Sequence, residues 1–151
     1  MHDLERKLQK KETSAPILVV NMPEELEALF EAFASPVVEI ENHKYFAMIL
    51  VFGQEIGKLQ TNARKVLSLL SPDGLFWVCY PKKSSKRYKG SNCGRDELIP
   101  LLAAEGFETV RQVAINEDWS GLRYREAKEI KNMKRSFAVT EEGKKKVQNS
   151  K

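Results

Sequence analysis

The sequence predicts a single α/β domain in three layers, with a mostly parallel sheet and a terminal antiparallel strand. Its 151 residues are enough for one hydrophobic core. The runs 45–52 and 75–80 are apolar throughout, which is typical of parallel strands that are covered on both faces. Stretches with helical periodicity alternate with these runs, and a hairpin-like pair of strands ends the pattern.

The first predicted elements are short. Residues 1–15 are polar and mixed in charge, and Leu4 and Leu8 lie one helical turn apart, which fits a short docked helix or a disordered segment. A strand follows at 17–20. A helix is then predicted over 23–33, with a proline at its first position and one apolar face, formed by Leu26, Leu29, Phe30 and Phe33.

A second strand is predicted at 37–41, and its pairing stays open. Only residues 42–44 separate it from the strand at 45–52, whereas a parallel crossover usually takes about a dozen residues or more. Either the second strand is very short and is followed by an extended segment, or the two strands pair antiparallel.

The second half alternates in the same way. Proline at the second position and glycine at the fourth position of Ser71-Pro72-Asp73-Gly74 favour a type I turn. A helix over 56–70 is expected before that turn, and a strand over 75–80 after it. The next helix is expected to be capped by Asp96 or a neighbour and ended by Gly106. Strands at 110–115 and from Leu122 follow, joined by a turn over 117–121.

Composition excludes some classes of protein. Apolar residues make up 42% and charged residues 30% of the chain, and no apolar run approaches the length of a membrane span. The first seven residues lack the apolar core of a signal peptide, so we expect a cytoplasmic protein without a membrane partner. The cysteines and histidines have no metal-ligand spacing, so we expect no metal site at Cys79, Cys93, His2 or His43.

The net charge of +4 comes from two segments. Residues 16–81 hold eight acids and four bases, and residues 96–125 hold six acids and three bases. Segment 82–95 instead holds six bases and no acid, and 126–151 hold eight bases and four acids. A basic loop on a mildly acidic body is a local electrostatic feature of the protein.

The chain is predicted to have three parts. A polar segment at 1–15 precedes the α/β domain at 16–126, and a charged tail follows at 127–151. Part of the tail has helical spacing and its end is expected to be disordered; the apolar residues on its helical face are Ile130, Met133 and Phe137.

The turn after the first strand lacks the residues of a nucleotide site. In α/β folds that bind nucleotides, glycines at this turn let the backbone close on phosphate or ribose. Here the turn reads Asn21-Met22-Pro23, and Glu24 and Glu25 follow in the first turn of the helix. Their carboxylates would repel an anion at the start of the helix. We therefore expect no cofactor.

From Tyr45 onward, the order of elements resembles the second half of a class I methyltransferase-type Rossmann fold. The connector Leu-Leu-Ser-Pro-Asp-Gly at 69–74 is similar to the turn before the fifth strand of those enzymes. Two features that the resemblance implies are missing: the glycine-rich first turn, and room for a third strand with its helix. The acid that would hold a ribose at the end of strand two could be Glu39 or Glu41, or these glutamates could stand there by chance.

Two motifs also resemble an uncharacterised bacterial domain family. In that family a strand runs into Tyr-Pro-Lys-Lys-Ser-Ser, matched here by 80–85, and a later Trp-Ser-x-Leu-Arg stretch is matched by 119–123. The likeness spans residues 16–126. No activity comes with this family, so the resemblance implies a fold and leaves the function open.

Three segments should meet at the carboxyl edge of the sheet, where open parallel sheets bind ligands: 21–23, 81–94 and 117–121. The ammonium and hydroxyl groups of 82–85 would suit a phosphate, although the same residues could form a solvated polar loop. The candidate ligand-binding residues are Asn21, Tyr80, Lys82, Lys83, Ser84, Ser85, Trp119, Ser120 and Arg123.

Several of these residues have two readings. Trp119 either lines a pocket or folds back as a lid over its own core. Arg123 either reaches the edge of the sheet or pairs with an acid. Cys93 could be activated by Arg95, but no histidine can be placed beside it. Tyr88 would suit stacking on single-stranded nucleic acid because of its basic neighbours, Lys86, Arg87 and Lys89.

The sequence favours a non-catalytic binding or regulatory domain. It would present 82–85 and Trp119 to an anionic small molecule or to a protein partner. Two alternatives stay open. One is a small enzyme that acts on a nucleotide or phosphorylated metabolite, with Lys82 and Lys83 stabilising charge. The other is a weak nucleic-acid-binding accessory protein, and no residue is assigned a catalytic role.

Overall fold

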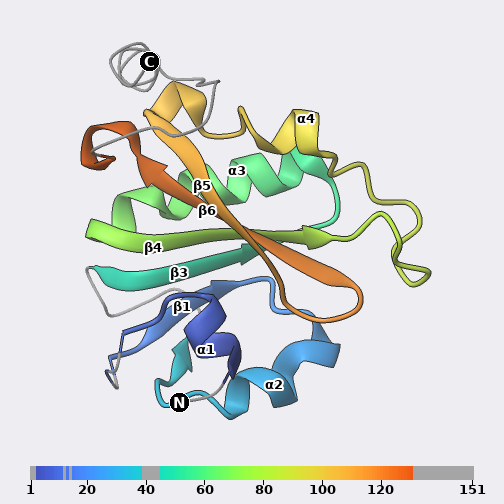
Figure 1. The fold of residues 1–151 in the computed structure, drawn as a ribbon, viewed down its shortest axis with the longest axis horizontal. Helices are drawn as coiled ribbons and strands as arrows, with labels where there is room; N and C mark the ends of the chain where they lie inside the picture. Colours follow the sequence, from blue (N-terminus) through green and yellow to red (C-terminus); the bar gives the residue numbers. More distant parts are fainter. Residues whose placement is uncertain (1–2, 12, 14, 39–44, 131–151) are drawn as a thin grey trace.

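One six-stranded sheet runs through the centre of the molecule (Figure 1). The computed structural model describes residues 3–11, 13, 15–38 and 45–130. The strand order is β2-β1-β3-β4-β6-β5; neighbours among the first four are parallel, and the last two form an antiparallel hairpin along β4. The strands are β1 (Ile17–Val20), β2 (Val37–Val38), β3 (Phe46–Phe52), β4 (Leu70–Pro81), β5 (Phe107–Ala114) and β6 (Trp119–Glu126).

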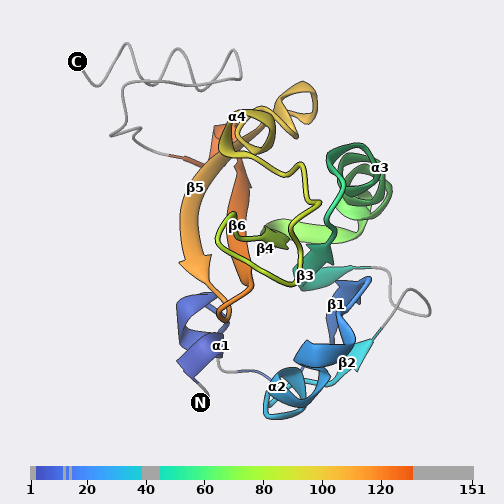
Figure 2. The same cartoon turned by 90° about the vertical axis from the view of Figure 1, so that its right-hand side faces the viewer.

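Helices cover both faces of the sheet, which confirms the three-layer α/β prediction (Figure 2). Helices α3 (Ile56–Val66) and α4 (Arg95–Leu98) lie on one face, and α1 (Asp3–Lys7) and α2 (Glu27–Glu31) lie on the other. Short 3-10 turns adjoin these elements at η1 (Glu24–Leu26), η2 (Leu67–Leu69), η3 (Ala103–Glu105) and η4 (Ala127–Glu129).

The central strands are apolar on both sides because both sides are covered. Successive side chains of a strand point to opposite faces. Ile49 and Val51 therefore pack with α3, whereas Leu50 and Phe52 pack with α1 and α2; all four are 0% exposed. Each such side chain contributes roughly 1.5–3 kcal/mol on burial. This double coverage explains the unbroken apolar run that the sequence shows in β3.

The segment between α3 and β4 differs from the prediction. The helix expected to reach Leu70 ends at Val66, and β4 begins directly after η2. Phe46 pairs with Leu70 and Met48 pairs with Leu75, so the expected turn at 71–74 is instead a bulge inside β4. Asp73 has a φ of 53°, and its carboxylate accepts two hydrogen bonds from Arg125, at 2.8 and 2.9 Å. A contact from another strand thus stabilises the bulge.

Other boundaries also differ. The helix predicted over 23–33 is the 3-10 turn η1 followed by the short α2, and α4 is capped by Gly94 rather than by Asp96. Gly106 does end the next turn, with a φ of 83° that glycine adopts without strain. Trp119 is the first residue of β6 and pairs with Pro81, so it does not lie in a turn.

The pairing of the second strand is resolved by β2, which is only two residues long and pairs parallel with β1, Ile17 opposite Val37. Residues 39–41 of the predicted strand, with Glu39 and Glu41, lie outside the described residues, as does the tail beyond 130. Among the described residues, no helix is long and apolar enough to span a membrane.

A buried ion pair stabilises the conformation of the N-terminal segment, which packs on the sheet. Lys10 Nζ lies 3.2 Å from Glu5 Oε2, and these side chains are 2% and 1% exposed. Lys10 Nζ also donates to the carbonyl oxygen of Thr13, at 3.0 Å. Leu4 and Leu8 are buried in the core, and the Leu8 carbonyl oxygen accepts a hydrogen bond from the indole of Trp77, at 3.1 Å. Residues 3–10 therefore complete one face of the domain.

We predict that removing one partner of this pair is more costly than replacing both. Lys10→Met leaves the Glu5 carboxylate buried without its cation, so the free energy of unfolding should fall by about 3 kcal/mol. The double variant Lys10→Met/Glu5→Leu should recover at least half of that loss. Urea denaturation measures both values, and a double variant less stable than Lys10→Met would contradict the prediction.

Candidate functional site

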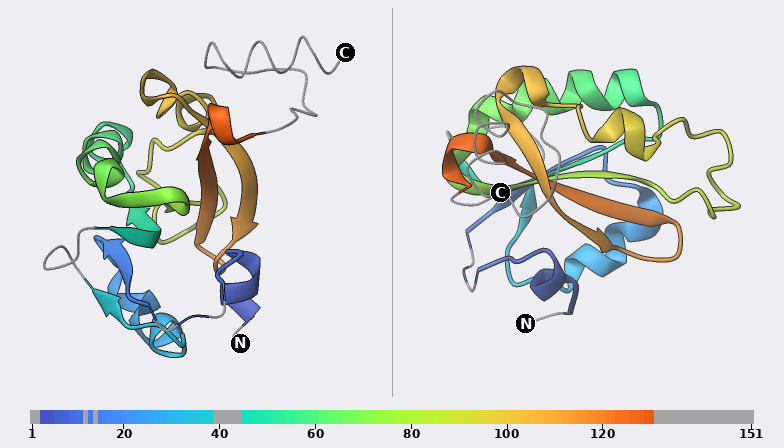
Figure 3. Two further views of the ribbon diagram at one scale, coloured as in Figure 1. Left: turned by 90° about the vertical axis from the view of Figure 1, so that its left-hand side faces the viewer. Right: turned by 45° about the horizontal axis from the view of Figure 1, so that its top comes forward.

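The loop at 82–94, here called the basic loop, crosses the carboxyl end of the sheet between β4 and α4 (Figure 3). Asp118 in the β5–β6 turn holds its first residues. The backbone N–H of Lys82 donates to the Asp118 carbonyl oxygen at 2.7 Å, and Ser85 Oγ donates to Asp118 Oδ1 at 2.7 Å. Ser85 is 4% exposed and also accepts from the backbone N–H of Tyr88, at 3.2 Å. Ser85 therefore shapes the loop from inside.

Glu25, in the turn η1 after β1, connects that part of the chain to this loop. Its Oε2 accepts hydrogen bonds from the Tyr88 hydroxyl and from the Trp119 indole N–H, the latter at 3.4 Å, and lies 3.5 Å from Arg87 Nε. Burial alone would raise the pKa of Glu25, but the hydrogen bonds from Tyr88, from its own backbone and from Trp119, with the charge of Arg87, hold it below its ordinary value. We call these four residues the Glu25 cluster.

Trp119 packs over the end of β3 within this cluster. The indole is 3% exposed; its ring lies 5.4 Å from that of Phe52 and 4.9 Å from that of Tyr88, both edge-on. A cleft of about 450 Å³ remains beside it, and Asn21 and Gly53 also line this cleft. Asn21 has a φ of 58°, so asparagine adopts the left-handed turn for which glycine was expected, but adds a side chain.

The other side of the basic loop lines a larger cavity of about 760 Å³. This cavity lies between the end of β4, α4 and the β5–β6 hairpin. We call it the basic pocket. Its lining includes four cationic residues and no aspartate or glutamate. The polar and charged residues that line it are Tyr80, Lys82, Lys83, Ser84, Arg95, Thr109, Arg111, Gln112 and Ser120.

The four cations of the basic pocket have no carboxylate within ion-pair distance among the described residues. They are Lys82, Lys83, Arg95 and Arg111. Two arginines elsewhere in the fold do have such partners; Arg64 contacts Glu105 and Arg125 contacts Asp73. An excess of positive charge is therefore concentrated at this cavity, where it would attract an anion.

Tyr80 and Gln112 connect two strands within the pocket. Gln112 Nε2 donates to the Tyr80 hydroxyl at 2.7 Å, so the hydroxyl keeps its own hydrogen for an acceptor. Burial raises the pKa of Tyr80, and the hydrogen bond from Gln112 opposes that effect in part. The phenol is thus a neutral donor at physiological pH, next to apolar surface from Leu98, Ile99, Val110 and Leu122.

The structure brings most of the predicted residues to this end of the sheet. Tyr80, Lys82, Lys83, Ser84 and Ser120 line the basic pocket, while Asn21 and Trp119 lie beside the smaller cleft.

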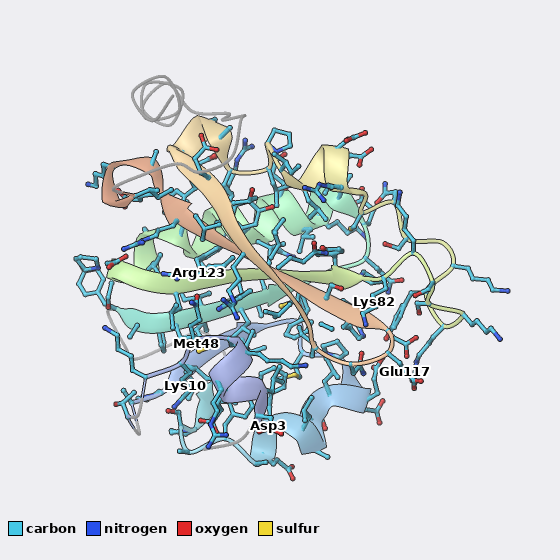
Figure 4. All side chains as sticks on the ribbon, in the orientation of Figure 1. Asp3, Lys10, Met48, Lys82, Glu117 and Arg123 are labelled. Atoms are coloured by element: carbon cyan, nitrogen blue, oxygen red, sulfur yellow. The ribbon has the colours of Figure 1, made fainter. Side chains whose placement is uncertain are left out.

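Ser85 and Arg123 line neither cavity. The Ser85 hydroxyl is buried against Asp118. Arg123 pairs with Trp77 in the middle of β4, and its Nη1 donates to Gln9 Oε1 at 2.9 Å; Figure 4 shows it well back along the sheet from Lys82. Burial raises the pKa of Cys93, which disfavours an activated thiolate.

Sequence reasoning missed the residues that come from distant elements. Glu25 was interpreted only as a charge that repels anions, and Arg111 and Gln112 were not considered as site residues. The hairpin places Gln112 opposite Leu122, on the face that carries Tyr80. One sequence feature does point to these pocket residues. Polar residues are mixed with apolar ones in this strand, and such polar positions need hydrogen-bond partners or solvent. They are Thr109, Arg111 and Gln112.

No protein-family model matches this sequence, and no curated protein matches it. Solved structures do match its fold. The N-methyltransferase NodS from Bradyrhizobium japonicum WM9 superposes with a TM-score of 0.51 at 15% identity, covering 82% of this chain and 91% of NodS. The mitomycin 7-O-methyltransferase MmcR gives a TM-score of 0.51 at 10% identity, covering 75% of this chain and 49% of MmcR.

A protein of the NADB-Rossmann superfamily from Streptococcus agalactiae gives a TM-score of 0.50 at 12% identity, covering 83% of this chain and 68% of that protein. Such low identities establish the fold alone. The methyltransferase-type Rossmann fold expected from the order of elements is therefore confirmed, and this chain spans about half the length of MmcR.

We predict that the Glu25 cluster weakens in acid. Because the pKa of Glu25 is lowered in the folded state, its contribution to stability is present above its ordinary value of 4.5 and is lost as the pH falls through the lower folded value. Glu25→Gln should therefore cost about 1 kcal/mol at pH 7 and much less at pH 3. Urea unfolding at both pH values measures the difference.

The neighbouring Glu24→Gln is the matched control for this prediction, because Glu24 is exposed. It should change stability little at either pH. An equal cost of Glu25→Gln at pH 3 and pH 7 would show that the charge of Glu25 does not hold the loop.

Proposed function

We propose that this chain is a non-catalytic binding domain that takes a small anionic ligand in the basic pocket. The observation that carries the proposal is the set of four cations, without ion-pair partners among the described residues, around a cavity whose lining contains no acid. Uncompensated positive charge costs free energy through self-repulsion, and a bound anion would remove that cost.

The size and the donors of the pocket support a small molecule as ligand. A volume of about 760 Å³ lies within the usual range for such sites, roughly 300–1,000 Å³. Lysine and arginine form strong charge-assisted hydrogen bonds with phosphate or carboxylate oxygens. The hydroxyls of Tyr80, Ser84 and Ser120 are further donors along the same wall.

The contacts between the basic loop and the turn after β1, on the side away from the basic pocket, support a non-catalytic role. The turn at Asn21 has no glycine, and the carboxylate of Glu25 is held there by Tyr88 and Trp119. These groups would oppose a nucleotide cofactor at the ends of β1 and β3. The same contacts disfavour the nucleic-acid alternative, because Tyr88, the ring it requires for stacking, packs on Trp119.

We predict that Lys82→Ala/Lys83→Ala removes anion binding without unfolding the protein. Inorganic pyrophosphate is the probe, and calorimetry should give an affinity at least tenfold weaker for the double variant. The free energy of unfolding should change by less than about 0.5 kcal/mol, since both lysines are at least partly exposed.

The matched control is Lys65→Ala/Lys86→Ala, which removes two exposed lysines that line neither this pocket nor the smaller cleft. It should bind pyrophosphate like the unmodified protein. Equal affinities for both double variants would contradict the proposal, as would a thermal shift with S-adenosylmethionine that exceeds the shift with pyrophosphate.

A further inference from the structure

The basic pocket adjoins a second cavity of about 540 Å³. The two cavities share five lining residues along the basic loop, and we treat them together as one groove: Pro81, Lys82, Lys83, Cys93 and Arg95. Three of these shared residues are cationic. The groove therefore carries its strongest positive charge in the middle, between two ends of different chemistry.

The end of the groove in the basic pocket combines apolar and polar side chains. Leu98, Ile99 and Leu122 supply hydrocarbon surface there, and Thr109, Arg111 and Gln112 line the same cavity. Such a surface suits a ring or another apolar group, while the amide and the hydroxyl can bond to polar atoms at its edge.

The other end of the groove is polar and carries acids. It is lined by Ser91, Asn92, Asp96 and Glu97, together with Tyr88 and Lys89. Neither Asp96 nor Glu97 has a side-chain hydrogen bond or ion pair among the described residues. Asn92 Oδ1 accepts from the backbone N–H of Ile56 at 2.8 Å, and the Asn92 side chain also donates to the Glu55 carboxylate, so its amide is held within the protein. The carboxylates of Asp96 and Glu97 can accept hydrogen bonds from a group rich in hydroxyls.

The acids also limit what can extend along the groove. A phosphate beside Asp96 or Glu97 would be repelled, whereas an uncharged hydroxylated group would not. A nucleic acid carries a charge at every linkage, so it does not match a groove that is cationic in the middle and acidic at one end.

We propose that the groove binds a nucleoside diphosphate sugar. The two linked phosphates lie against Lys82, Lys83 and Arg95, the nucleoside lies on Leu98, Ile99 and Leu122, and the sugar hydroxyls bond to Asp96 and Glu97. This inference rests on the anion-binding function proposed above, and adds the class of ligand to it.

Calorimetry with matched probes tests the inference on the full chain. The probes are inorganic pyrophosphate, the nucleoside diphosphates UDP, ADP and GDP, and the corresponding UDP-glucose, ADP-ribose and GDP-mannose. At least one sugar nucleotide should bind tenfold or more tightly than its own diphosphate, and each diphosphate should bind at least as tightly as pyrophosphate.

The variant Asp96→Asn/Glu97→Gln separates a sugar-binding role from a general charge effect. Loss of two negative charges should leave pyrophosphate binding equal or tighter, but should reduce the tenfold preference for the sugar nucleotide to less than threefold. Glu117→Gln is the control, because Glu117 is exposed and lines neither cavity; it should keep the preference.

The outcomes distinguish the two proposals. If the unmodified protein does not bind pyrophosphate, the anion-binding function fails, and this inference fails with it. If pyrophosphate binds and Lys82→Ala/Lys83→Ala weakens it, but no sugar nucleotide exceeds its diphosphate by tenfold, the class of ligand is wrong and the anion site stands. An unchanged preference in Asp96→Asn/Glu97→Gln would also overturn the inference.

Discussion

The carboxylate of Glu25 is the interaction on which the arrangement of this edge depends. It lies in the first turn after β1, yet its partners come from the basic loop and from the first residue of β6. A half-buried carboxylate requires hydrogen-bond donors, and Tyr88 and Arg87 of the basic loop contact this one. Because the loop is anchored on this side, Lys82 and Lys83 line the cavity on the other side.

The short α4 provides the room for that cavity. It has only four residues, Arg95–Leu98, so the hairpin face next to Tyr80 is only partly covered. In this molecule a methyltransferase-type fold thus presents a cationic groove beside the sheet, while its carboxyl edge near β1 is occupied by Trp119 and Tyr88. Both the cationic groove and the occupied edge near β1 depend on the basic loop, because its residues contribute to each of them.

The sequence was sufficient for the parts of the structure that local patterns determine. The apolar runs of β3 and β4 identified the centre of the sheet, because burial on both faces requires apolar residues at every position. The lysines after β4 marked the loop that lines the pocket. Boundaries that depend on distant contacts could not be predicted in this way: Arg125 stabilises the bulge at 71–74, and Phe52 and Tyr88 surround Trp119.

The same distinction applies to the site. A glutamate near the start of a helix repels anions on its own, but here the charge is taken up by donors that lie 63 and 94 residues further along the chain, at Tyr88 and Trp119. Arg111 and Gln112 line the pocket because β5 pairs with β6 with an irregular register between Thr109 and Arg111. No local sequence pattern specifies this register.

Amide chemical-shift mapping of the labelled protein tests most directly where ligands bind. Titrations with the tightest-binding of the three sugar nucleotides and, separately, with S-adenosylmethionine would be followed residue by residue. We expect the sugar nucleotide to shift the amides of Lys82, Lys83, Arg95 and Gln112, and S-adenosylmethionine to shift none. Saturable shifts centred on Asn21, Glu25 and Gly53 with S-adenosylmethionine would contradict this account.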